Sequence, residues 1–184
     1  MNVGNHHGNV VCPLLLVQCA DASGATLLGI VIDIGSGDSL VVLEGDQPRS
    51  VRLAGVVSPV KSEAWAEQSK RQLSQLVLGK AVTIDWSEVD AKGSVVGRVL
   101  YTAPPPASGA MTRPARVDAG MQMIFTGLAR YDPSSAGGLS ELVRSVYWGA
   151  ENRARDFCNG LWADRESEEG ALCERRKKRF PQNE

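Results

Sequence analysis

The sequence is poor in the side chains that most often build metal centres and catalytic triads. Its only histidines, His6 and His7, lie in a Gly- and Asn-rich opening stretch. Its four cysteines (Cys12, Cys19, Cys158 and Cys173) include no Cys-x-x-Cys pair. A zinc site with closely spaced ligands is therefore excluded, and histidine-dependent catalysis is not expected. The cysteines are interpreted as free thiols of an intracellular protein.

Aromatic residues and excess charge are also scarce. Aromatic residues make up 5% of the chain, and 20 Lys and Arg balance 21 Asp and Glu to a net charge of −1. These values exclude a polybasic binder acting through bulk charge, and they disfavour broad base-stacking surfaces. The apolar run Val10–Val17 is interrupted by Pro13 and falls short of the roughly 20 residues that a membrane helix needs. We expect no membrane association and a cytoplasmic location. The nucleus is the alternative location, because the C-terminal segment is basic.

Enough apolar sequence is present for one globular domain. The chain has 184 residues, of which 43% are hydrophobic. Strands are predicted at Thr26–Ile34, Leu40–Glu44, Ser50–Val57, Ala81–Trp86 and Val95–Tyr101, and helices at Ser62–Leu78, Ala119–Ala129 and Leu139–Cys158. In the last helix, Leu142, Val146 and Ala150 are placed on one apolar face. Five strands divided by a helix and followed by helices are typical of a small barrel with helical packing.

Six short segments occur in an order that resembles one known family. They are Gly37-Asp38-Ser39-Leu40, Val51-Arg52-Leu53-Ala54-Gly55-Val56, Ser58-Pro59, Leu76 to Val82 (LVLGKAV), Gly127-Leu128-Ala129, and Ala150 to Arg155 followed by Gly160-Leu161-Trp162. On these segments the chain resembles the staphylococcal nuclease-like (thermonuclease) family from about residue 24 to 162. The resemblance implies an α+β fold, a five-stranded OB-fold β-barrel with accessory helices. The expected domains are a flexible N-terminus (1–9), the nuclease-like domain (10–162) and a charged tail (163–184).

The family's chemistry implies a set of residues that this sequence keeps only in part. The family uses calcium held by two aspartates and a backbone or hydroxyl oxygen, a glutamate as general base, and two arginines on the phosphate. Asp38, Ser39 and Arg52 retain three of these positions. Val57 stands in place of an aspartate, Val60 in place of the glutamate, and Ser94 in place of the second arginine. Valine cannot accept a proton, so the sequence predicts loss of catalysis.

The leading hypothesis is therefore a non-catalytic binding or scaffold module in a protein or RNA–protein assembly, without cofactor or bound metal. The alternative is a calcium-dependent nuclease with a displaced site, in which Asp33 would supply an ion ligand. Arg98 is expected on the same face of its strand as Ser94. Four residues along a strand span roughly 13 Å, so Arg98 is too far away to take the place of the missing arginine.

The binding hypothesis rests on exposed basic residues. Arg52 is interpreted either as the ion-pair partner of Asp38 or as a residue that still grips a phosphate. Another protein subunit, RNA or both are expected as partners, contacted by Arg52, Lys92 and the cluster Arg175, Arg176, Lys177, Lys178 and Arg179.

Overall fold

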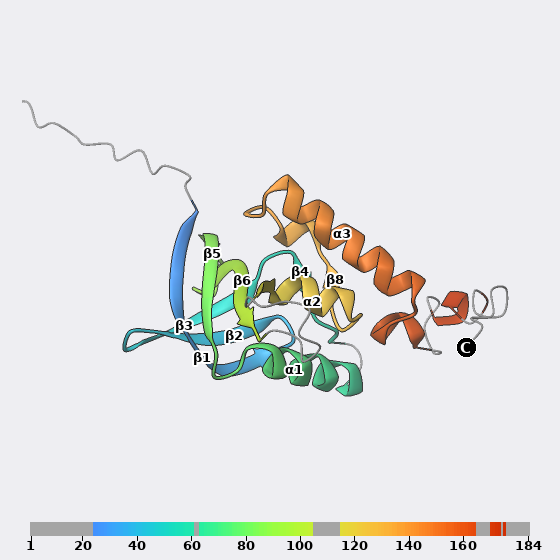
Figure 1. Ribbon diagram of the computed structural model, residues 1–184, viewed down its shortest axis with the longest axis horizontal. Helices are drawn as coiled ribbons and strands as arrows, with labels where there is room; N and C mark the ends of the chain where they lie inside the picture. The colour runs from blue at the N-terminus through green and yellow to red at the C-terminus, as the bar shows by residue number, and fades with distance from the viewer. Residues whose placement is uncertain (1–23, 61–62, 105–114, 165–169, 174, 176–184) are drawn as a thin grey trace, which may run out of the picture.

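The core of the protein is a closed barrel of five strands (Figure 1). The computed structural model describes residues 24–60, 63–104, 115–164, 170–173 and 175. The barrel strands are β1 (Ala25–Ser36), β2 (Ser39–Glu44), β3 (Gln47–Leu53), β5 (Ala81–Val89) and β6 (Val95–Ala103). They run antiparallel in the order β3-β2-β1-β5-β6, and a parallel pairing of β3 with β6 closes the barrel. The α+β OB-fold barrel expected from the sequence is confirmed.

The barrel strands form because apolar side chains recur on their inner face. Val42 of β2, Val51 of β3, Ile84 of β5 and Val99 of β6 are all at most 1% exposed. The predicted strand Ser50–Val57 is divided in two by a turn at Gly55, which has φ +69°. The second piece, β4 (Val56–Val57), leaves the barrel and pairs with β8 (Arg130–Tyr131).

The helices cover one side of the barrel. The first is α1 (Glu63–Val77), followed after the barrel strands by α2 (Ala119–Phe125) and α3 (Glu141–Asp156). Figure 1 shows α2 between the barrel and α3. The short elements are β7 (Ala115–Asp118), which extends the sheet beside β6, and the 3-10 turns η1 (Pro133–Ser135) and η2 (Gly160–Ala163). The helix predicted for Ala119–Ala129 ends early because the chain turns at Gly127, which has φ +71°.

The buried face of α3 differs from the predicted one. Leu142 and Val146 are 76% and 48% exposed, and only Ala150 of the expected face is buried. The buried face of α3 also carries Tyr147, Glu151 and Ala154, and Glu151 accepts the backbone N–H of Tyr131 in β8. The chosen apolar positions lay on the flank of the helix, while a tyrosine and a glutamate fill the interface.

A buried polar network fixes α2 and α3 to the barrel. Asp118 caps α2 by accepting from the Met121 backbone N–H at 3.1 Å. The same carboxylate accepts from Arg98 Nε at 2.6 Å and from the Tyr147 hydroxyl at 2.9 Å. Burial, together with the Asp118 charge, raises the pKa of Tyr147 far above its usual value. The network therefore holds a neutral phenol against an ion pair.

Two of the cysteines form a disulfide. Cys158, at the end of α3, is bonded to Cys173, 15 residues further along the chain. The expectation of free thiols is therefore wrong for this pair, because α3 and the segment 170–173 meet in space. Cys12 and Cys19 lie outside the described residues. Across the described part of the chain, no helix has the length and apolar character needed to cross a membrane.

Candidate functional site

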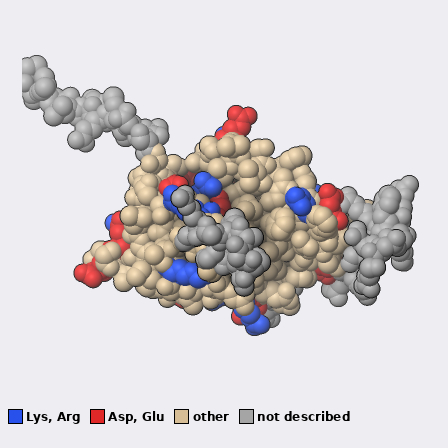
Figure 2. Space-filling view, viewed as in Figure 1, with Lys and Arg blue, Asp and Glu red and all other residues tan. Residues whose placement is uncertain are grey.

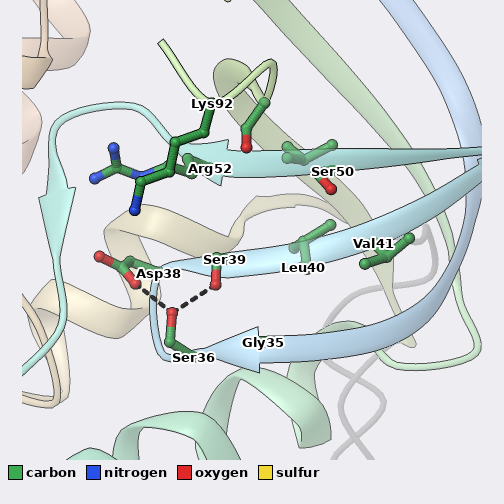
Figure 3. A pocket seen from close by; sticks show the side chains of 11 residues that line it. Gly35, Ser36, Asp38, Ser39, Leu40, Val41, Ser50, Arg52 and Lys92 are labelled. Carbon is green, nitrogen blue, oxygen red and sulfur yellow. Dashed lines mark hydrogen bonds between the residues drawn. The ribbon is translucent and has the colours of Figure 1, made fainter. Parts of the chain in front are cut away.

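A pocket of about 450 Å³ opens where β2 and β3 meet the turn between β5 and β6. It is lined by Gly35, Ser36, Asp38, Ser39, Leu40, Val41, Ser50, Val51, Arg52, Lys92 and Ser94. Three of the residues singled out from the sequence, Asp38, Arg52 and Lys92, therefore meet in one place. Figure 3 shows the side chains of Arg52 and Lys92 extending to the same end of the pocket, where the Asp38 carboxylate lies.

The Asp38 carboxylate is held in position by neighbouring serines. Ser36 Oγ donates to Asp38 Oδ1 at 2.5 Å, and Ser58 Oγ donates to the same oxygen at 3.0 Å. The backbone N–H of Ser58 lies 3.3 Å from Asp38 Oδ2. These bonds connect the turn between β1 and β2 to the segment after β4. The carboxylate thus has a fixed orientation toward the pocket.

The close packing of α1 against the turn between β1 and β2 depends on Gly37. A Cβ at this position would overlap the hydroxyl of Ser69 on α1 and come within 3.0 Å of Ser58 Cβ. Ser69 is fully buried, and its hydroxyl has no hydrogen-bond partner among the residues that the structure describes. Only glycine therefore lets α1 approach the turn that carries Asp38.

The basic side of the pocket is organised by Asp90. Its Oδ1 accepts the backbone N–H groups of Lys92 and Ser94, both at 2.9 Å, and its Oδ2 lies 3.5 Å from Arg52 Nη1. The Ser94 bond, with those from Lys92 and Arg52, lowers the pKa of Asp90 below 3.8. Asp90 thus shapes the turn that carries Lys92 and also fixes Arg52.

The interpretation of Arg52 and Asp38 as an ion pair is wrong. Arg52 pairs with Asp90, and Asp38 is bonded by Ser36 and Ser58. The Asp90 and Ser58 contacts were missed because they join residues 38 and 20 positions apart. The Asp-x-x-Gly turn at 90–93 was the one available signal for Asp90.

One of the three positions where the family's catalytic residues are replaced is part of the pocket lining. Ser94 lines it, Val57 is 39% exposed in β4, and Val60 is 85% exposed just beyond. Val57 and Val60 present hydrocarbon where a calcium site of the family type needs carboxylates. The described residues contain no group of three or more His, Cys, Asp or Glu side chains placed to hold a metal. One carboxylate, already bonded by two serines, does not fit the family's calcium site.

The substitutes considered for the missing residues, Asp33 and Arg98, are absent from the lining of this pocket. Asp33 lines a different pocket, with Glu67, Lys70 and Arg71, so it does not face Asp38. Arg98 is paired with Asp118 and does not line the pocket, which agrees with the prediction that it lies too far from Ser94 to replace the arginine. Neither Asp33 nor Arg98 therefore adds a charged group to this pocket.

Basic residues do not form a continuous surface on the visible face. Figure 2 shows several separate patches of Lys and Arg, most with acidic side chains close by. Arg175 is exposed and is absent from the pocket lining. Arg176, Lys177, Lys178 and Arg179 lie outside the described residues. A role for this cluster in binding stays a prediction.

Known proteins resemble this chain along most of its length. A family model described as staphylococcal nuclease homologue matches residues 50–164. Protein ParB of Escherichia coli is 30% identical, covering 82% of this chain and 81% of that protein. A micrococcal nuclease of Shigella flexneri is 30% identical over 79% of each chain. An uncharacterized endonuclease of E. coli is 27% identical, covering 80% of this chain and 82% of that protein.

These names overturn the expectation of a non-catalytic protein. Two of the relatives are named as nucleases, so the comparisons point to an enzyme and give no support to a scaffold or RNA-binding role. The expectation took the absence of three motif residues as absence of activity. The barrel, the six motif segments in the family's order and the match over residues 50–164 all agree. The chain therefore belongs to the staphylococcal nuclease family.

Proposed function

We propose that this protein is a nuclease that hydrolyses phosphodiester bonds of nucleic acid in the pocket of Asp38, Arg52 and Lys92. One observation carries the proposal: a fixed carboxylate lies in the same pocket as two cationic side chains. A phosphodiester needs cations for its oxygens and a proton acceptor for the attacking water. The names of the relatives favour this chemistry over binding alone.

Arg52 and Lys92 are the phosphate-binding groups of the proposed site. A guanidinium offers paired N–H donors that match two phosphate oxygens, and an ammonium adds a compact charge. The Asp90 carboxylate holds Arg52 and the Lys92 turn together before any substrate binds. This arrangement lowers the entropic cost of placing two cations on one phosphate.

Asp38 is the proton acceptor of the proposed site. The pocket lining includes no other carboxylate. With Val60 in place of the family's glutamate, the role passes to the acidic group that remains. Ser36 and Ser58 fix its orientation but leave lone pairs of the carboxylate available to a water molecule.

The disulfide bears on where this nuclease works. Disulfides such as Cys158–Cys173 persist in oxidising compartments and are rare in the cytosol of mesophiles. We therefore propose an oxidising compartment in place of the cytoplasm expected from the sequence. Its nucleic-acid substrate would then be met outside the cytosol.

The proposed function is tested with the purified full chain and fluorescein-labelled single-stranded DNA and RNA oligonucleotides. We expect cleavage by the wild-type protein and a loss of about 10²–10⁴-fold in Asp38→Asn. Asp46→Asn, in the exposed turn between β2 and β3, is the matched control and should cleave normally. Cleavage that is equal in wild type and Asp38→Asn, or absent from both, would overturn the proposal.

A further inference from the structure

The charge balance of the pocket differs from that of a calcium-dependent site. Its lining carries one carboxylate, Asp38, and two cationic side chains, Arg52 and Lys92, and neither Val57 nor Val60 is part of it. A divalent cation would meet a single carboxylate that two serines already bond, with Arg52 and Lys92 repelling it. A phosphodiester anion, by contrast, meets the Lys92 ammonium and the Arg52 guanidinium, the second of which is also paired with Asp90 at 3.5 Å.

We propose that this site works without a divalent cation, with the Lys92 ammonium supplying the charge and the proton that a metal-bound group would otherwise supply. The inference rests on the proposed nuclease function. Lys92 lies two residues before Ser94, the position where the family's second arginine is replaced. Its side chain enters the pocket beside Arg52 and toward Asp38 (Figure 3).

The turn between β5 and β6 holds Lys92 at the pocket. Asp90 accepts the backbone N–H of Lys92 and of Ser94, so the turn is closed on both sides of Gly93, which has φ +82°. The ammonium can therefore reach the pocket without ordering a free loop. The same carboxylate lies 3.5 Å from Arg52 Nη1, so the backbone of the Lys92 turn and the Arg52 guanidinium contact one group.

The reaction balances with these residues alone. Asp38 takes a proton from water, and the water oxygen forms a new bond to phosphorus. The bond from phosphorus to the leaving ester oxygen breaks with its electron pair, and Lys92 gives that oxygen a proton. Arg52 stabilises the added charge on the remaining phosphate oxygens. The products are a phosphomonoester and an alcohol, and the proton on Asp38 returns through solvent to the Lys92 amine.

The test measures cleavage of the labelled oligonucleotide by metal-stripped full-length protein in excess EDTA, with added calcium and with added magnesium. Wild type should cleave equally in all three conditions. Lys92→Met should lose about 10²–10³-fold in kcat in EDTA, comparable to removal of one charge-stabilising donor. Lys92→Arg, which keeps the charge but is a poor proton donor, should recover binding and little of kcat.

Lys70→Met is the matched control, because Lys70 is an exposed lysine that lines the separate pocket with Asp33. It should cleave like wild type. As a second readout, oligonucleotide binding followed by fluorescence anisotropy in EDTA should weaken in Lys92→Met and not in Lys70→Met. This readout reports on Lys92 independently of turnover.

The outcomes separate the two proposals. Cleavage that EDTA abolishes and calcium restores would overturn the metal-independent site and leave the nuclease function standing. EDTA-resistant cleavage that is unchanged in Lys92→Met would overturn the role of Lys92. No cleavage under any condition would overturn the nuclease function and this inference with it.

Discussion

Arg52 and Asp90 form an ion pair that ties β3 to the turn between β5 and β6, with Nη1 and Oδ2 3.5 Å apart. Because Asp90 also accepts the backbone N–H of Lys92, one carboxylate contacts both the Arg52 guanidinium and the turn that carries Lys92. Asp90 touches no substrate in the proposed site, so it acts as a positioning residue.

Removal of the Asp90 carboxylate should slow cleavage of the oligonucleotide without unfolding the protein. In Asp90→Ala, the Lys92 turn loses its closure and Arg52 loses its anchor. We expect kcat/KM for the oligonucleotide to fall by about 10–10²-fold, since small misplacements of catalytic groups are costly. Asp46→Ala is the control for loss of an exposed turn aspartate. An unchanged kcat/KM in Asp90→Ala would show that the turn keeps its shape unaided.

Acidification should remove the contribution of Asp90 to stability. Hydrogen bonds from Ser94, Lys92 and Arg52 lower the folded pKa of Asp90 below 3.8, so its contribution is full above that pH. The contribution is lost as the pH falls through the lower folded value. The difference in Tm between wild type and Asp90→Asn should therefore shrink below about pH 3.8. A difference that grows on acidification would contradict this sign.

The buried Tyr147 hydroxyl should be essential to the joint between α3 and the barrel. Tyr147→Phe leaves Asp118 buried with fewer donors, which we expect to lower the free energy of unfolding by about 1–3 kcal/mol. Urea denaturation measures the change. Tyr131→Phe is the control, because it removes the same oxygen from a half-buried tyrosine whose ring packs edge-to-face with that of Tyr147. Since burial raises the pKa of Tyr147, wild-type stability should also decline as the pH rises above about 10.

A methyl group at position 37 should disturb the turn that carries Asp38. Gly37→Ala forces apart the turn and Ser69 of α1, at an expected cost of about 1–3 kcal/mol. Cleavage should fall as well, because the same shift moves Asp38. Gly137→Ala is the matched control, since no atom lies within 4 Å of the added Cβ. Equal stability of the two variants would show that α1 yields without cost.

The disulfide should contribute measurably to stability. A 15-residue separation gives a chain-entropy contribution of about 3 kcal/mol. Wild-type protein should therefore unfold at a lower urea concentration after treatment with dithiothreitol. Cys158→Ser should match the reduced wild type and respond little to the reductant. A large response in that variant would assign the effect to other cysteines.

The sequence predicted the barrel well because each strand alternates apolar residues toward one core. It also identified Asp38, Arg52 and Lys92, which carry charge within recognisable segments. The roles of Ser58 and Asp90 were not predicted, because they depend on hydrogen bonds between residues far apart in the sequence. The face of α3 was misassigned because Tyr147 and Glu151 are buried through polar contacts, which hydrophobic spacing does not reveal.

The expectation of lost catalysis failed for a related reason. It counted which of the family's residues are missing and did not ask what else lies in the pocket. In the site that we propose, Lys92 is two positions away from the replaced arginine, and it lies on a turn closed by Asp90. Only the three-dimensional arrangement places its ammonium with Arg52.

The bond between Cys158 and Cys173 also changes what a protease can do to this protein. A single cut anywhere in the chain between these two residues would leave both pieces covalently joined. The nicked protein would migrate as one species on a denaturing gel without reductant and as two species with it. The end of the chain would therefore stay attached to α3 after cleavage, and it would separate only where thiols are kept reduced.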